Sequence, residues 1–308
     1  MVKKVLYCFD INNNRDFVLI CCIHHIMEIT NNMYSILWDK LQEGDDTPEN
    51  LWVILWNGVP IFPKNCIIFN FDCMSITANY DQFVSQLDNS PDTQIRAFVD
   101  FSGTTNPAIM TSLISANSAK FPGENYQVVP YGCTMYNNFL WNSFVPNPLP
   151  EKDIDVLYYG SNAGRRADII NVVSEYCLSI GKVFYYLSTD PLDEKTKCEY
   201  VVRSRIVLSI VGDDDLTYQM NDLLKVSYLI CNKIVCIAEF TGDPIETTLS
   251  SYTTYTNTID NMNERINYFL LTATETEIND YVNNAYEHFH VDFPYQDTIG
   301  NLIAPFTV

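Results

Sequence analysis

The first half of the chain alternates short apolar runs with polar segments that contain Gly, Pro or Asn. Apolar runs of about four to eight residues that end at such segments are typical of β-strands. The runs of this kind are Val2–Phe9, Leu51–Trp56, Cys66–Phe71, Ile95–Phe101 and Tyr126–Pro130. Residues Phe17–Leu41 instead repeat apolar positions near helical spacing, which predicts a helix. Strands separated by helices or loops indicate a parallel sheet.

The second half of the chain restarts the same alternation. Its apolar runs predict strands at Asp155–Tyr159, Val183–Leu187, Ile206–Val211 and Ile234–Glu239. Helical spacing predicts helices at Ala167–Ile180 and Leu216–Cys231, a short helix that ends within Tyr200–Arg205, and one or two helices in Met262–His288. The chain therefore contains two consecutive α/β units of similar size.

A proline-rich segment, Asn142–Asp153, separates the two units; it contains Pro146, Pro148 and Pro150. Proline stops regular elements and favours an extended linker. We therefore predict an α/β fold with two Rossmann-like domains facing a cleft, residues 1–145 and residues 146–260. Terminal helices in residues 261–308 are expected to pack back across the cleft. Ligands in such folds bind at the C-terminal ends of the strands.

Composition limits the function classes. The 308 residues suffice for two domains, and 47 % hydrophobic residues can supply their cores. The formal net charge of −20 argues against general binding to nucleic acid or to an anionic membrane, although a local basic site remains compatible with it. Arg165, Arg166, Arg203 and Arg205 lie close together in sequence, which suggests one place that needs positive charge. The alternative is a set of surface ion pairs.

Cysteine and histidine give no sign of a metal site. The ten cysteines form no Cys-x-x-Cys pair, and Cys21, Cys22, Cys66, Cys231 and Cys236 stand in apolar runs. They indicate small buried thiols in a reducing compartment. The four histidines lack ligand spacing with cysteine, which argues against zinc. We find no signal peptide and no apolar run long enough to span a bilayer, so we expect a cytoplasmic protein.

The most informative stretch runs from Asp155 to Ile170, where an apolar strand enters a Gly-Ser turn at the start of a helix. Gly160 and Gly164 carry no Cβ, which lets the backbone approach a ligand closely. Helix N-terminal N–H groups favour anions, and Arg165 and Arg166 add forked donors suited to phosphate. The alternative is a plain strand–turn–helix with two solvated arginines.

Several segments follow one another in an order known from a protein family. Val129-Pro-Tyr-Gly132 precedes the linker, and Asp155-Val-Leu-Tyr-Tyr-Gly-Ser161 with Arg165-Arg166 follows it. The later segments are Ser204–Leu208, Lys225–Leu229 and Asn232–Glu239, and Asp100–Ser102 is weakly similar. Together these segments, between Ile95 and Asp243, resemble a group of GT-B glycosyltransferases and glycosyltransferase-like proteins that depend on a nucleotide sugar.

The resemblance implies that the first domain binds the acceptor and the second binds the nucleotide diphosphate of an activated sugar. The donor-binding residues would be Gly160, Ser161, Arg165, Arg166, Lys225 and Glu239. Lys225 would offer a point charge to phosphate, and Glu239 would accept hydrogen bonds from ribose hydroxyls. The resemblance implies no cofactor beyond the donor substrate, and GT-B catalysis generally needs no divalent metal.

Aspartates after predicted strands are the candidates for catalysis. Asp10 follows the first strand and is a candidate general base, although loop capping is the commoner role of such a residue. Asp72 is a second candidate at a strand end, with a turn residue as the alternative. Asp213-Asp214-Asp215 satisfies an Asp-x-Asp metal pattern, but we favour an acidic solvated loop there.

Two departures from the family concern the catalytic machinery. The paired glutamates of retaining GT-B enzymes are not evident in Gly212–Gln219, and Asp10–Asn14 stand where the first domain would carry a Gly-rich loop. We expect a glycosyltransferase whose acceptor, whether glycan, lipid-linked or protein, the sequence does not identify. The alternatives are a non-catalytic GT-B-like nucleotide- or sugar-binding protein and an acidic interaction protein.

Overall fold

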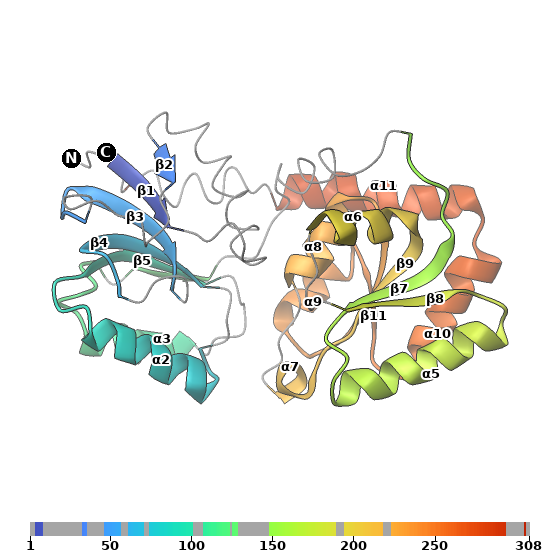
Figure 1. Ribbon diagram of the computed structural model, residues 1–308, viewed down its shortest axis with the longest axis horizontal. Helices are drawn as coiled ribbons and strands as arrows, with labels where there is room; N and C mark the ends of the chain where they lie inside the picture. The colour runs from blue at the N-terminus through green and yellow to red at the C-terminus, as the bar shows by residue number, and fades with distance from the viewer. Residues whose placement is uncertain are drawn as a thin grey trace. The chain divides into compact units, whose positions relative to one another are not determined.

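A computed structural model describes residues 4–8, 33–35, 46–56, 61–70, 74–100, 107–123, 125–128, 148–188, 194–217, 223–293 and 305. The chain divides into two compact units, Met1–Pro130 with Tyr295–Val308 and Tyr131–Pro294. Each unit is built on a parallel sheet (Figure 1). The predicted boundary at residues 145 and 146 lies outside the described residues and stays a prediction.

The sheet of the first unit has the strand order β2-β1-β3-β4-β5-β6, and every pairing is parallel. Its strands are β1 Lys4–Cys8, β2 Met33–Ser35, β3 Asn50–Leu55, β4 Asn65–Asn70, β5 Gln94–Asp100 and β6 Tyr126–Val128. The predicted strands of this half are confirmed within a few residues. The expectation of one helix over Phe17–Leu41 is wrong for Met33–Ser35, because these residues pair with β1, from Val5–Met33 to Tyr7–Ser35.

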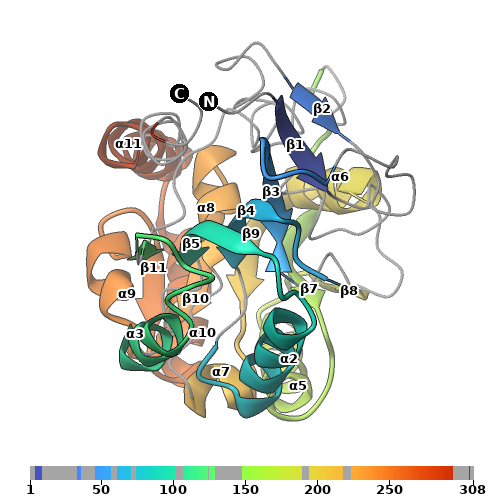
Figure 2. The ribbon, with the colours of Figure 1, turned by 90° about the vertical axis from the view of Figure 1, so that its left-hand side faces the viewer.

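Helices α2 (Thr77–Asp88) and α3 (Pro107–Ala116) cover the same face of this sheet (Figures 1 and 2). Phe83 of α2 and Met110 of α3 are fully buried in one core with Trp52 and Phe98 of the strands. Trp56, the residue after β3, belongs to the same core, so both Trp52 and Trp56 serve packing.

The sheet of the second unit has the order β11-β10-β9-β7-β8, again parallel throughout. Its strands are β7 Ile154–Gly160, β8 Phe184–Ser188, β9 Ser204–Ser209, β10 Val235–Glu239 and β11 Thr254–Thr256. The chain first adds β8 on one side of β7 and then adds β9 on the other side. Strand order therefore reverses between β7 and β9, which defines a topological switch point.

The helices of the second unit lie on both faces of its sheet, as Figure 1 shows. They are α5 Arg165–Ser179, α6 Glu194–Arg203, α7 Asp213–Thr217, α8 Leu223–Cys231, α9 Pro244–Leu249, α10 Ile259–Asn267 with the π-helical turn η3 Tyr268–Thr272, and α11 Glu275–Asp292. Helices α5 and α10 cover one face, α6 and α8 cover the other, and α11 packs against α8. Met262 and Val282 of the terminal helices belong to the core of this sheet, so these helices are part of the second unit. Their predicted packing across a cleft stays a prediction.

Two sequence expectations concern the chain as a whole. Cys66, Cys231 and Cys236 are buried free thiols, as predicted, whereas Cys21 and Cys22 lie outside the described residues. Within the described ranges, no helix has both the length and the apolar character that crossing a bilayer requires.

Candidate functional site

The switch point of the second unit gathers most of the residues predicted to bind a donor. Gly160 ends β7, Arg165 begins α5, Val211 follows β9, and Glu239 ends β10. The C-terminal ends of parallel strands share one edge of a sheet, and ligands of such sheets bind at the switch point. The topology therefore places these residues where a Rossmann-like sheet takes its ligand.

Two glycines shape the turn between β7 and α5. Gly160 has a φ of +150°, and a Cβ built on it would lie 2.6 Å from the Tyr158 hydroxyl oxygen. Gly164, the residue before α5, has a φ of +55°, and its Cβ would lie 3.2 Å from a carboxylate oxygen of Asp213. L side chains rarely adopt such backbone angles, so the turn requires glycine at both positions.

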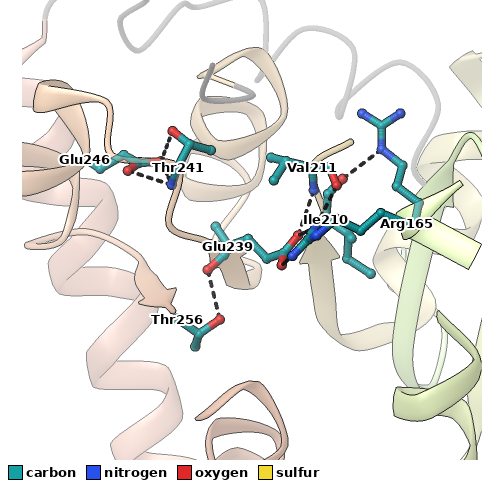
Figure 3. Close-up of polar contacts among 9 residues, drawn as sticks. Arg165, Ile210, Val211, Glu239, Thr241, Glu246 and Thr256 are labelled. Atoms are coloured by element: carbon teal, nitrogen blue, oxygen red, sulfur yellow. Dashed lines mark hydrogen bonds and ion pairs between the residues drawn. The ribbon is translucent and has the colours of Figure 1, made fainter. Parts of the chain in front are cut away.

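Arg165 and Glu239 form a two-point ion pair at this edge (Figure 3). The Nη1 of Arg165 donates to Oε2 of Glu239 at 2.8 Å and to the carbonyl oxygen of Val211 at 3.0 Å, while its Nη2 donates to Oε1. The backbone N–H of Val211 donates to the same Oε2 at 3.0 Å. The hydrogen bond to Glu239 raises the pKa of the Arg165 guanidinium, and the charge of Asp213 raises it further. The ion pair thus connects α5 with β10, and both side chains also bond to the backbone of the segment after β9.

Arg166, the second residue of α5, also contacts the segment after β9. Its Nε donates to the carbonyl oxygen of Ile210 at 3.2 Å, and a Cβ on Gly212 would lie 3.2 Å from its guanidinium carbon. A side chain at residue 212 would therefore press on Arg166. The segment after β9 thus receives both arginines, Arg166 at Ile210 and Arg165 at Val211.

Lys225 contacts the turn through the backbone. Its Nζ donates to the carbonyl oxygen of Tyr159 at 3.0 Å and lies 4.5 Å from the centroid of the Tyr159 ring. The structure therefore brings Lys225 to the residue before Gly160, and contact of the ammonium with phosphate stays a prediction. Ser161, also predicted to bind the donor, is exposed in the turn, and its carbonyl oxygen accepts from the Tyr158 hydroxyl at 3.1 Å.

The loop after Glu239 is held by a carboxylate that sequence reasoning missed. Glu246, with no exposed surface, accepts from the N–H and hydroxyl of Thr241 and from the N–H of Gly242, at 2.9–3.0 Å. Asp243 caps α9 through the N–H of Ile245, and Pro244 follows it. An Asp-Pro start with Glu at the third helical position is a known helix-start signal, which was present in the sequence.

The catalytic candidates of the first unit are not described by the structure: Asp10 and Asp72 both lie outside the described residues. A different carboxylate lies at the C-terminal end of β5. Asp100 is fully buried and accepts from the amide of Asn70 at 3.0 Å and from the Tyr126 hydroxyl at 3.2 Å. Asp10 and Asp72 therefore stay predictions, and Asp100 adds a hydrogen-bonded carboxylate at the C-terminal edge of the first sheet.

Arg203 and Arg205 do not join the arginines of the turn, so the interpretation of all four as one positive site is wrong. Arg203 is the last residue of α6 and Arg205 is the second residue of β9, so both lie at the N-terminal end of β9, the opposite edge of the sheet from Gly160. Arg203 forms a two-point pair with Asp153, with Nε 2.8 Å from Oδ1, and Arg205 lies 3.4 Å from Asp155. These two are exposed surface ion pairs, the alternative that the sequence had left open.

Among the described side chains, no three His, Cys, Asp or Glu residues converge as metal ligands. The carboxylate of Asp213 lies beside Gly164 and contributes to the field at Arg165. Asp213, the first residue of Asp213-Asp214-Asp215, therefore lies next to the turn between β7 and α5.

Comparison with known proteins identifies the fold. No protein-family model matches the chain, and no curated protein matches it in sequence. It is similar in structure to the N-terminal domain of Candida albicans trehalose-6-phosphate phosphatase, with 10 % identity, a TM-score of 0.57, and 100 % of this chain and 98 % of that one covered. A sucrose-phosphate synthase from Thermosynechococcus elongatus gives 9 % identity, a TM-score of 0.55 and 99 % coverage of both chains. A trehalose-6-phosphate structure from E. coli bound with UDP-2-fluoro glucose gives 9 % identity and a TM-score of 0.53, with 97 % of this chain and 98 % of that one covered.

These likenesses extend over nearly the whole length of each chain. Together with the two parallel sheets, they show that the chain has the GT-B fold. The predicted α/β fold class of two Rossmann-like units is confirmed.

Proposed function

We propose that this chain is a glycosyltransferase that moves a sugar from a nucleotide-sugar donor to an acceptor. The observation that carries the proposal is the Arg165–Glu239 pair beside the Gly160 turn, at the switch point of the second sheet of a GT-B fold. A diphosphate leaving group builds up negative charge as it departs, so fixed cations and N–H groups at this place would stabilise the transition state.

Each donor-site residue has a role that its contacts support. Arg165 uses three hydrogen bonds to hold Glu239 and Val211, and an arginine has five N–H donors, so two point elsewhere and suit a phosphate oxygen. Oε1 of Glu239 accepts from Arg165 and has a second lone pair for a ribose hydroxyl. Gly160, Ser161 and Arg166 complete the diphosphate site, and Lys225 adds positive charge beside the turn.

The neighbours favour particular substrates to test first. One holds UDP-2-fluoro glucose and another is a sucrose-phosphate synthase, so we propose a UDP-hexose as donor and a sugar phosphate as the first acceptor class to test. Glycan, lipid-linked and protein acceptors follow. Asp10 and Asp72 are the proposed candidates for the general base, and no divalent metal is required in this scheme.

The test is release of nucleoside diphosphate from UDP-glucose, ADP-glucose and GDP-mannose, measured with and without sugar-phosphate acceptors. We expect release from one donor, faster with its acceptor and strongly reduced in Arg165→Ala. Arg203→Ala, which removes the ion pair with Asp153 at the opposite edge of the same sheet, should retain the parent rate. Donor binding without turnover on any acceptor would identify a non-catalytic binding protein, and absence of both would contradict the proposal.

A further inference from the structure

Three side chains donate hydrogen bonds to the carbonyl oxygens of three consecutive residues at the end of β7 and the start of the turn after it. Nζ of Lys225, from α8, donates to Tyr159 at 3.0 Å. The hydroxyl of Tyr186, from β8, donates to Gly160 at 3.1 Å, and the hydroxyl of Tyr158, from β7, donates to Ser161 at 3.1 Å. We call these three side chains the carbonyl clamp.

The clamp fixes where the amides of the turn point. A trans peptide unit is planar, so its C=O and the N–H of the next residue point in opposite directions. Holding the carbonyls of residues 159, 160 and 161 therefore directs the N–H groups of Gly160, Ser161 and Asn162 away from the clamp. Donors that are already oriented need no reorganisation when an anion arrives, which is the condition for strong electrostatic binding.

The clamp residues are themselves held in place. Tyr158 is only 1 % exposed, and its ring stacks on that of Tyr186 with centroids 6.1 Å apart and an angle of 16° between the planes. The Lys225 ammonium lies over the rings of Tyr158 and Tyr159, 5.1 and 4.5 Å from their centroids. The absence of a Cβ on Gly160 leaves the space that the Tyr158 hydroxyl occupies.

We infer that Tyr158, Tyr186 and Lys225 are positioning residues that hold the Gly160–Asn162 turn in the conformation that binds the diphosphate of the donor. The inference rests on the proposed function. It assigns Lys225 an action through the carbonyl of Tyr159, where the family resemblance had suggested contact with phosphate. The two tyrosine hydroxyls act in the same way, that of Tyr158 from β7 itself and that of Tyr186 from the neighbouring strand β8.

The test is calorimetric titration of the full chain with UDP and with inorganic pyrophosphate, using Tyr186→Phe and Tyr158→Phe. Each change removes one hydroxyl and keeps the ring, so we expect each to weaken both ligands by about three- to tenfold. The matched control is Tyr185→Phe, because Tyr185 lies on the same strand and its hydroxyl forms a 3.1 Å hydrogen bond to that of Tyr200. The control should bind both ligands like the parent.

Lys225 supplies a second arm that separates positioning from general destabilisation. Lys225→Met removes the hydrogen-bond donor to Tyr159 and should weaken the binding of pyrophosphate. Lys225→Arg keeps a hydrogen-bond donor near Tyr159 and should restore most of the affinity. Parent-like affinity in both tyrosine variants would overturn the inference and leave the proposed function standing. If the parent binds none of the four ligands UDP, ADP, GDP and pyrophosphate, both the proposed function and this inference are overturned.

Discussion

Arg165 and Glu239 lie 74 residues apart in the chain and face each other in a two-point ion pair at the C-terminal edge of the second sheet. The pair joins the first residue of α5 to the last residue of β10, and the backbone after β9 bonds to both side chains. The side chain of Arg165 is 28 % exposed and that of Glu239 is 10 % exposed. The carboxylate is thus the more buried partner and depends on the arginine for compensation.

Removing either partner should destabilise the second unit, and the losses should not add. For Arg165→Ala, Glu239→Gln and the double variant, we expect a coupling free energy of about 1–2 kcal/mol, kept modest by the exposure of the arginine. Urea unfolding of the parent and the three variants measures it. Strict additivity of the two single changes would show that the pair has no energetic coupling.

Gly160→Ala should be more damaging than the same change at another glycine with positive φ. Alanine at residue 160 would be strained and would displace the Tyr158 hydroxyl, so we expect a loss of about 1–3 kcal/mol of unfolding free energy together with weaker UDP binding. Gly181 is the matched control, because its φ is +69° and nothing lies within 4 Å of a Cβ placed there. If the two alanine variants lose equal stability, the Tyr158 contact does not constrain the turn.

Glu246→Ala should loosen the loop that follows Glu239. The N–H groups of Thr241 and Gly242 would lose their acceptor, at a cost of about 2–4 kcal/mol in unfolding free energy. Amide hydrogen exchange at these two residues should rise markedly. Glu264→Ala, an exposed change on α10, should stay within about 0.5 kcal/mol of the parent. Unchanged exchange at Thr241 and Gly242 would show that Glu246 does not hold the loop.

The sequence sufficed for the strands and for the turn because both depend on local signals. Short buried runs such as Ile154–Gly160 are almost wholly apolar in parallel sheets, and glycines mark the turn that follows. The ion pair between Arg165 and Glu239 was not predictable in this way, because periodicity along the chain does not say which distant side chains meet. Sequence proximity was misleading for Arg203, which the parallel topology places at the other edge of the sheet from Arg165.

Met33–Ser35 shows a second limit of local signals. Helical spacing of apolar residues over Phe17–Leu41 predicted one helix, but pairing with β1 makes these three residues a strand. The hydrogen bonds of a parallel ladder come from a distant segment, and they outweigh the weak local preference for helix. Tyr186 is a similar case: its place on β8 was predicted, whereas its hydrogen bond to Gly160 depends on the pairing of β8 with β7.

The most direct test of the account is calorimetric titration of the parent, Arg166→Ala and Arg203→Ala with UDP, ADP and GDP. We predict that the parent binds at least one of these and that Arg166→Ala binds it about tenfold or more weakly, because a charge-assisted contact to phosphate is lost. Arg203→Ala should bind like the parent, since its partner is Asp153 at the other edge of the sheet. A parent that binds no nucleoside diphosphate, or an Arg166→Ala variant that binds as tightly as the parent, would contradict the assignment of the Gly160 turn as the donor diphosphate site.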